Sequence, residues 1–491
     1  MRPIASTPPP TPESPRGNRV LLIFVGLQLG MILSTLDGTI VATALPTIGR
    51  DLGSRAEPAW VLTGYFLAQV ATVPLYGKLG DLYGRKRVYL SALTLFTAGS
   101  VLCGAAGSVE QLVAFRVLQG IGSGGLGPLA MAVLADVVPA RRLGRWLGYQ
   151  GALFAVASLI GPLVGGVFVD RLSWRWAFYV NLPLAVVSAT IVVLALHVPY
   201  RRIPHAIDYA GAALLTTAIA SVVLVASIGG REVSWASPLV VGLVLLAAVC
   251  LVLFVQRERR AREPVLPLGM LASRVVRASA GLNLTSGALF AAGIYFIPVF
   301  LQQVRDVSPT ESGFLLVPFM FTTAFGTLVA GRRVEATGTY RAWPIAGALC
   351  SLAGVALLAT IGADTGAATV ALFGAVLGTG IGFIMQTSLL ALQNGVGARD
   401  LGVATSTALL SRMLGVTLGT AAGAAVLQSG LGGAGSPGAA LYAGALPDVY
   451  LAMIPVAIVT LLLALRLPEH PLRDHAHEAA VPTEPTPRVA G

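Results

Sequence analysis

Long apolar stretches recur along almost the whole chain, and they restrict its possible folds more than any other feature of the sequence. A bilayer core of about 30 Å requires about 20 apolar residues per helix, so each such stretch is a candidate membrane span. The sequence contains fourteen of them, near residues 20–46, 58–77, 87–107, 110–136, 146–169, 176–198, 209–229, 236–256, 278–302, 311–331, 342–362, 367–393, 402–428 and 448–466. It therefore predicts an all-α polytopic membrane protein with both termini on one side.

Composition excludes an ordinary soluble domain. Only 11% of the 491 residues are charged and 55% are hydrophobic, whereas soluble domains are about 25% charged. The first eighteen residues lack the apolar core and cleavage site of a signal peptide, so we expect the first span to act as an uncleaved signal. Cys103, Cys250 and Cys350 lie in apolar stretches without metal-ligand spacing. We predict no metal site and no cofactor.

The basic residues predict the orientation, because cytoplasmic loops retain positive charge during membrane insertion. With a cytoplasmic N-terminus, the inside segments hold 25 of the 33 basic residues and the outside loops hold 6. The net charge of +11 then reflects topology and contact with anionic lipids rather than nucleic-acid binding. The only lysines are Lys78 and Lys86, and this arginine bias is typical of GC-rich bacteria. We expect a bacterial plasma (inner) membrane protein with both termini cytoplasmic.

An internal repeat divides the chain. The segments Gly77–Arg87 and Gly331–Arg341 both read glycine, three residues, an acid, two residues, glycine, two residues and a base, and they lie 254 residues apart. The same offset relates Gly161 and Gly165 to Gly415 and Gly419. The repeat predicts two six-helix halves in parallel orientation, an arrangement that in transporters rocks around a central site near the bilayer midplane.

This division predicts five regions. They are a disordered cytoplasmic N-terminus (1–18), an N-terminal six-helix half (19–200), two inserted helices (201–260), a C-terminal six-helix half (261–466) and a disordered cytoplasmic tail (467–491). The tail is too polar to pack, and we do not expect its histidines to bind a metal.

Several motifs in the N-terminal half occur in an order that is typical of one transporter family. They are Leu36–Val41 with Ala44–Pro46, the loop Gly77–Arg87, Arg116–Gly122, Gly161–Gly166, and Ser173–Phe178 with Asn181 and Pro183. Together they resemble the major facilitator superfamily, and within it the fourteen-helix drug:proton antiporters. The resemblance implies two six-helix halves plus two inserted central helices, and multidrug efflux by alternating access.

Asp37 lies inside the first span, where a carboxylate is costly and is normally retained for a transport pathway or a proton site. Reversible protonation of Asp37 is our main mechanistic hypothesis, and a structural carboxyl bonded to a neighbouring helix is the alternative. Arg116 lies at a comparable depth in the fourth span, so the two can pair. The resemblance implies a proton-transfer role for Arg116. The alternative is an arginine that bonds only backbone carbonyls.

The first copy of the repeated loop is a candidate gate. Its residues are Gly77, Asp81, Gly84, Arg85, Lys86 and Arg87. Asp81 can accept hydrogen bonds from a helix N-terminus or pair with an arginine. The resemblance implies that the loop stabilises the outward-open state against the second half. A charge cluster that only sets topology is the alternative.

Small residues form a stripe on the fifth span. The resemblance identifies Gly161, Pro162, Gly165 and Gly166 as the antiporter motif, and small residues permit close helix contact. Gly415, Gly419 and Gly423 supply a matching stripe on the thirteenth span. We expect the two stripes to form a sliding interface between the halves, with ordinary helix packing as the alternative.

Polar residues within other spans are candidates for the substrate cavity. They are Tyr65, Gln69, Asn283, Thr285, Tyr295, Gln386 and Arg412. Each could instead form a hydrogen bond between helices. Arg412 is an intramembrane charge with no acid near it in sequence, and it either faces the cavity or contacts lipid phosphate.

These features favour a proton-coupled secondary transporter that exports small lipophilic compounds such as drugs, antibiotics or toxic metabolites. We expect it to function as a monomer, with a small-molecule substrate, protons and membrane lipids as its partners. No P-loop sequence is present, which disfavours an ATP-driven pump. A proton-coupled metabolite importer is the nearest alternative, and the antiporter motif opposes it. An enzyme or receptor would need clustered His, Asp or Glu near one membrane face, and the sequence offers none.

Overall fold

The computed structural model describes residues 17–52, 60–138, 140–196, 208–229, 233–261, 268–397, 400–431 and 438–472. These parts of the chain are α-helical, apart from one short 3-10 helix, connecting turns and a bridge between Gly229 and Val233. The predicted all-α class is confirmed. The two expected disordered termini fall largely outside the described residues.

The helices follow the predicted spans in order. The N-terminal half contains α1 (Gly17–Asp51), α2 (Trp60–Tyr83), α3 (Arg85–Gly104), α4 (Val109–Val137), α5 (Ala140–Arg171), α6 (Trp176–Tyr179) and α7 (Asn181–Ala195). The inserted pair is α8 (Tyr209–Ile228) and α9 (Pro238–Glu258), followed by the 3-10 helix η1 (Leu268–Ala272). The C-terminal half contains α10 (Arg274–Gln303), α11 (Pro309–Thr337), α12 (Ala342–Leu358), α13 (Ala367–Asn394), α14 (Leu401–Leu431) and α15 (Ala439–Arg466).

Eleven helices in the described part of the chain are long and apolar enough to cross a membrane. A further apolar helix, α12, has 17 residues and is shorter than the usual span. In α2, polar residues such as Gln69 interrupt the apolar sequence. The multi-pass architecture is therefore supported, and the count of fourteen spans stays a prediction.

The backbone carries the same repeat as the sequence. Helices α2 and α11 end at Tyr83 and Thr337, which are 254 residues apart, and α3 and α12 end at Gly104 and Leu358 with the same offset. Gly84 and Gly338 follow α2 and α11 with positive φ angles of 90° and 74°. Glycine adopts such angles without the steric penalty of a side chain, so both copies of the loop can turn sharply.

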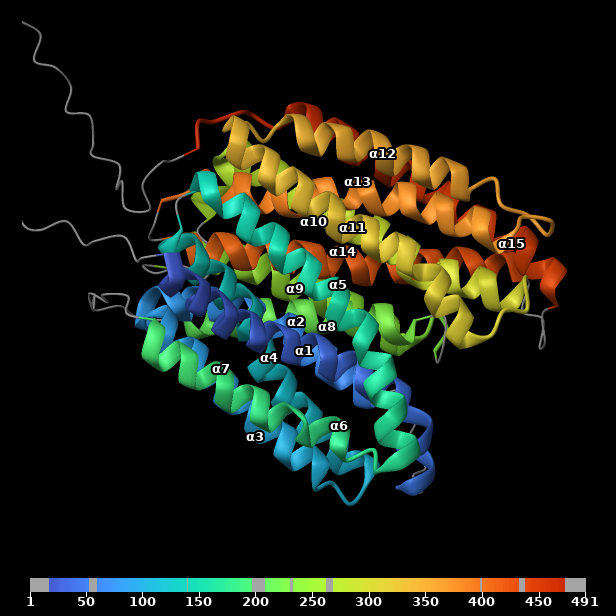
Figure 1. Cartoon of the computed structure of the whole chain (residues 1–491), viewed down its shortest axis with the longest axis horizontal. Helices are drawn as coiled ribbons and strands as arrows, with labels where there is room; N and C mark the ends of the chain where they lie inside the picture. Colours follow the sequence, from blue (N-terminus) through green and yellow to red (C-terminus); the bar gives the residue numbers. More distant parts are fainter. Residues whose placement is uncertain are drawn as a thin grey trace, which may run out of the picture.

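The two halves meet along two pairs of helices. Across the interface, α5 packs on α11 and α2 packs on α14. Within each half the first helix packs on the fifth, α1 on α5 and α10 on α14. Figure 1 shows α1 beginning and α15 ending at the same end of the bundle. We name this the inner end, since the basic residues predict that it is cytoplasmic, and the opposite end the outer end.

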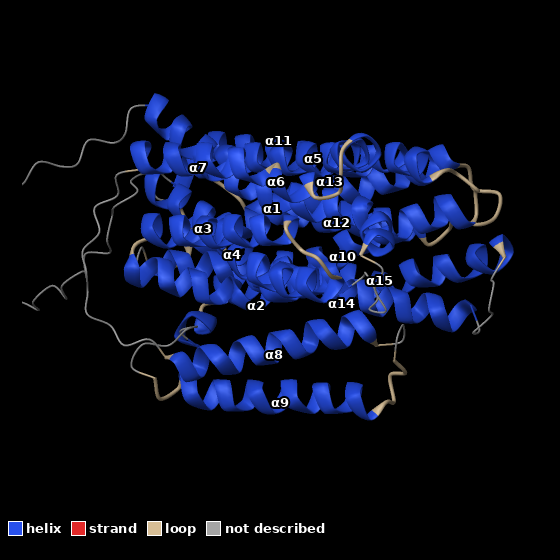
Figure 2. Cartoon of the chain, turned by 90° about the horizontal axis from the view of Figure 1, so that it is seen from below, coloured by secondary structure: helices blue, strands red, loops and turns tan. Residues whose placement is uncertain are grey.

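The inserted pair forms a separate layer. Figure 2 shows α8 and α9 side by side below the rest of the bundle. Helix α8 contacts both α2 and α14, so it covers one of the two interfaces between the halves. Asp208 caps α8 through the Gly211 amide and pairs with Arg257 of α9 at 3.0 Å. Although burial opposes it, these bonds hold the pKa of Asp208 below its usual value.

Candidate functional site

The two intramembrane charges of the N-terminal half form an ion pair between α1 and α4. Arg116 Nη1 donates a hydrogen bond to Asp37 Oδ2, and both side chains are completely buried. Arg116 Nε also donates to the Val61 carbonyl at 3.3 Å, and its guanidinium lies 3.9 Å from the centroid of the Tyr65 ring. The expected pairing is present, in place of an arginine bonded only to backbone carbonyls.

Two amide side chains complete the surroundings of the Asp37 carboxylate. Its Oδ1 atom accepts hydrogen bonds from Gln119 Nε2 at 2.8 Å and Asn181 Nδ2 at 3.0 Å. Both amides also donate to Ser100 Oγ, and Gln119 Oε1 accepts from Arg116 at 2.9 Å. A buried charge is tolerated only when it is paired and hydrogen-bonded, and this network from α1, α3, α4 and α7 meets that requirement.

A second polar network lies beside the pair and involves two predicted cavity residues. Tyr65 Oη, on α2, lies 2.8 Å from Ser123 Oγ of α4, and Gln69 Nε2 donates to the same hydroxyl at 2.8 Å. Ser34 of α1 contacts Tyr65, Gln69 and Ser123. Because the Arg116 guanidinium stacks on the Tyr65 ring, Tyr65 connects this hydroxyl network to the ion pair.

In the C-terminal half, Arg412 lies on α14 and reaches toward α10 and α13. Its Nη2 atom donates to Asn283 Oδ1 and to the Met385 carbonyl, both at 3.0 Å. Asn283 in turn donates to Ser388 Oγ at 3.0 Å. The structure therefore brings Arg412 and Asn283 together, and Gln386 is the residue next to Met385, with 6% of its surface exposed.

The remaining cavity candidates occupy less distinctive positions. Thr285 bonds the Gly281 carbonyl of its own helix at 3.1 Å, a common way for threonine to satisfy its hydroxyl in a helix. The side chain of Tyr295 is 48% exposed on α10. Neither observation assigns them to a binding surface.

Asp81 links the candidate gate to the opposite half. Its carboxylate accepts hydrogen bonds from the Gly402 and Val403 amides at the start of α14, at 3.2 and 3.1 Å. Arg85 donates to Asp81 at 2.8 Å and pairs with Asp136 at 2.5 Å. A carboxylate at a helix N-terminus satisfies amides that have no partner within the helix. Both contacts expected of Asp81 are thus present at the inner end.

Other residues of the loop Gly77–Arg87 have separate contacts. A side chain at Gly77 would overlap Gly402 and Ser406 of α14, so glycine allows α2 and α14 to touch. Lys86 donates to the Val193 and Leu196 carbonyls near the end of α7, at 2.7 and 2.8 Å. Arg87 is exposed, and Gly84 forms the turn.

The second copy of the loop also reaches the other half, but through a weaker contact between side chains. Glu335, which corresponds to Asp81 in the repeat, lies 3.5 Å from Arg145 of α5. Each loop acid therefore reaches the fifth helix of the other half. The ion pair of Glu335 and Arg145 is longer and partly exposed, so it contributes less to stability.

The small-residue stripes do not meet as expected. A side chain at Gly161 would overlap Thr39 of α1, and one at Gly415 would overlap Leu284 of α10. Each stripe lets the fifth helix of a half approach the first helix of the same half. The expected contact of one stripe with the other is replaced by packing within each half, because the fifth helices pack across the interface on α11 and α2 instead. Gly165 is buried, and the surroundings of Pro162 and Gly166 fall outside what the structure describes.

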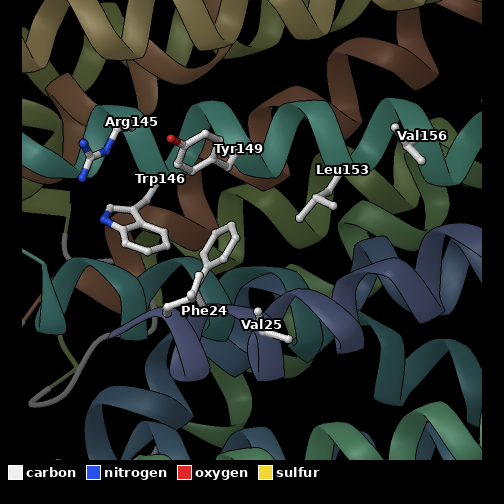
Figure 3. Close-up of a pocket in the computed structure, with 8 residues that line it drawn as sticks. Phe24, Val25, Arg145, Trp146, Tyr149, Leu153 and Val156 are labelled. Atoms are coloured by element: carbon white, nitrogen blue, oxygen red, sulfur yellow. The ribbon is translucent and has the colours of Figure 1, made fainter. Parts of the chain in front are cut away.

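A cavity of about 640 Å³ lies between α1 and α5 toward the inner end. Figure 3 shows Phe24 of α1 and Trp146 of α5 pointing toward each other across it, with Arg145 and Tyr149 on the same face of α5. Its volume is in the range of small-molecule pockets. None of the predicted cavity residues lines it, and the exposed Leu21, Val25 and Val156 at its edge make it a groove open at the protein surface.

Comparison with known proteins decides the family. Residues 27–420 match the model of the Major Facilitator Superfamily. The chain belongs to this superfamily. The predicted membership is confirmed, and so is the prediction that the chain is a transporter and not an enzyme.

Named relatives place this member of the superfamily in its drug-efflux branch. The chain is 37% identical to the multidrug transporter protein MdtP of Bacillus subtilis, over 85% of this chain and 77% of that protein. It is 35% identical to multidrug resistance protein 3 of the same organism, over 81% and 77%. The structure of the proton:xylose symporter XylE aligns with a TM-score of 0.64 at 15% identity, over 93% and 98%, which shows a shared fold.

Sequence reasoning placed Gln119 and Asn181 within family motifs but did not identify them as partners of Asp37. Gln119 follows Arg116 by three residues and so lies on the same helix face, a signal that could have identified it as a partner of Asp37. Asn181 is an amide at the start of an apolar segment, which is a similar signal. Ser34, Ser100 and Ser123 give none, because serine is common in membrane helices.

Proposed function

We propose that the protein exports small lipophilic compounds across the plasma membrane in exchange for protons, by alternating access, as a monomer with cytoplasmic termini. The observation that carries this proposal is the completely buried pair of Asp37 and Arg116. Charges inside membrane proteins are expensive and are usually retained for function. The relatives named as multidrug transporters support a broad, lipophilic substrate range.

In the proposed cycle, the pair converts a proton into a conformational change. Protonation of Asp37 removes the counter-charge of Arg116, and leaving a buried charge unpaired costs about 3–5 kcal/mol. Helices α1 and α4 then separate until water or substrate solvates the guanidinium. Release of the proton on the other side of the membrane restores the pair.

Contacts at the inner end support an outward-facing state for the described conformation. Asp81 bonds the start of α14, and the backbones of α2 and α14 approach each other at Gly77. On the opposite interface, Gly148 and Gly151 of α5 allow contact with Leu328 and Thr327 of α11. In alternating access, closure at one end accompanies opening at the other, so breaking these contacts would accompany the inward-facing state.

Transport into inverted membrane vesicles tests the proposal. Two fluorescent dyes with one aromatic scaffold, 1-pyrenesulfonate and (pyrenylmethyl)trimethylammonium, carry permanent charges of opposite sign and do not follow the pH gradient passively. We expect an acidic vesicle interior to drive uptake of at least one dye, and Asp37→Asn to abolish this uptake. The control is Asp51→Asn, the same substitution at the exposed end of α1, which should retain uptake.

Gradient-driven uptake that survives in Asp37→Asn would move the proton site to another residue. Uptake of neither dye under any gradient would contradict export of this substrate class. Accumulation only with the gradient reversed would identify an importer.

A further inference from the structure

Arg412 is a positive charge inside the C-terminal half without a negative partner. In the described part of the chain no carboxylate forms an ion pair with it, and its Nε atom is buried without a hydrogen-bond acceptor. Its two acceptors, Asn283 and the Met385 carbonyl, are neutral. A guanidinium has five donors, and here only Nη2 has described partners. The remaining donors and the charge are available to another group.

Arg412 lies too deep in the bilayer for a lipid headgroup to be that group. It lies eleven residues from the start of α14 at Leu401, which is about 16 Å along a helix that rises about 1.5 Å per residue. The hydrocarbon core is about 30 Å thick, so this position is near the middle. Lipid phosphates lie at the two surfaces of that core.

Arg412 also lies close along α14 to a contact between the two halves. Leu409 precedes Arg412 by three residues and therefore shares its helix face. Leu409 lies against Gly127 of α4, a helix of the N-terminal half. This contact between the halves lies about one helical turn closer to the inner end than Arg412. Arg412 itself is partly exposed. This is the position of a central substrate site in a two-half transporter.

Gln386, the residue after Met385, also has a buried polar atom without a described partner. Gln386 follows Met385, whose carbonyl accepts from Arg412. The Gln386 side chain is 6% exposed, and its Oε1 atom has no hydrogen-bond partner among the described residues. Buried polar atoms are almost always satisfied, and an exception points to a missing ligand or water. Arg412 Nε and Gln386 Oε1 are thus two buried polar atoms on α14 and α13 without a partner among the described residues.

We propose that Arg412 binds an anionic group of the transported compound, a carboxylate, sulfonate or phosphate, with Asn283 holding the guanidinium in place and Gln386 Oε1 accepting a hydrogen bond from a donor elsewhere on the compound. The proposal rests on the proposed function and narrows its substrate class to lipophilic anions. The anion supplies the charge that the C-terminal half lacks, and the guanidinium supplies paired donors that suit such groups.

The same two dyes test this proposal in inverted vesicles. The wild-type protein should transport 1-pyrenesulfonate with a lower KM than the trimethylammonium dye. Arg412→Gln should raise the KM for the sulfonate about tenfold or more, the effect of losing one charge-assisted hydrogen bond, and should leave the cation within about twofold. The KM of Arg412→Lys for the sulfonate should fall between those of the wild type and Arg412→Gln. The control is Arg466→Gln, the same substitution at an exposed position of the same half, which should behave as wild type.

A binding measurement keeps the test decisive if transport is weak. In purified protein, 1-pyrenesulfonate should raise the unfolding temperature of the wild type and of Arg466→Gln, and should not raise that of Arg412→Gln. An equal loss for both dyes would assign Arg412 a structural role and overturn the proposal, as would unchanged handling of the sulfonate. Gradient-driven uptake of the cation alone would overturn the anion site while preserving proton-coupled export. Uptake of neither dye, with sulfonate stabilisation that depends on Arg412, would retain the site and reject the transport function.

Discussion

The two halves share a backbone plan but handle charge in opposite ways. In the N-terminal half, Arg116 is completely buried and is neutralised by Asp37 and two amides. In the C-terminal half, the repeat positions of these two residues are Ala291 and Val370, and the intramembrane charge is the unpaired Arg412. The two copies of the repeat share helix ends and turns, while their charged side chains differ. If both proposals hold, proton coupling and substrate contact are divided between the halves.

The largest difference between the halves should appear in stability when each arginine is removed. Arg116→Gln leaves the Asp37 carboxylate buried without its counter-charge, and we expect a loss of about 3–5 kcal/mol. Arg412→Gln removes a cation that has no acidic partner, so stability should stay the same or rise. Thermal unfolding of the two purified variants measures the contrast, and equal losses would contradict it.

A double substitution sharpens the same point. Asp37→Asn with Arg116→Gln removes both charges and keeps polar groups of similar size, so it should unfold at a higher temperature than Arg116→Gln alone. The interaction energy from the double-mutant cycle should be at least about 1–3 kcal/mol. If the two losses simply add, the pair contributes no coupling and the contrast between the halves fails.

Substitution of the two loop acids should produce a smaller difference between the halves. Asp81→Asn weakens two bonds to the start of α14, whereas Glu335→Gln affects a longer, partly exposed pair. The thiol of Ser406→Cys, in a background without the native cysteines, reports opening of the α2–α14 contact because Ser406 is buried there. We expect Asp81→Asn to raise its maleimide labelling about tenfold and Glu335→Gln to change it little. Similar labelling in both variants would contradict the ranking.

The smallest effects should come from the two turn glycines. Gly338 has φ 74° and ψ 3°, near the left-handed region, with open space around it, so Gly338→Ala should cost about 1 kcal/mol. Gly84 has φ 90° and ψ 124°, a region that residues with side chains avoid, and Gly84→Ala should cost more. Unfolding temperatures of both variants check the order, and a reversed order would show that the surroundings outweigh the backbone.

The sequence predicted the multi-pass helical architecture because apolar length is a local signal and the 254-residue offset can be counted directly along the chain. It also predicted that Asp37 and Arg116 lie at similar depths, which is enough to expect a pair. It could not predict the contacts of the stripes at Gly161 and Gly415, since small residues indicate close approach without identifying the neighbour. The role of the amides Gln119 and Asn181 as partners of Asp37 was missed for a related reason: which helix faces which depends on tertiary packing.

The layer formed by α8 and α9 has a consequence for how the inner end opens. Because α8 contacts both α2 and α14, their separation must expose apolar surface on at least one of the three helices. In a bilayer that surface meets lipid chains rather than water, so its exposure costs little hydrophobic free energy. The inserted pair therefore offers little resistance to the separation of α2 and α14. In the described conformation the pair covers the α2–α14 side of the bundle and not the α5–α11 side.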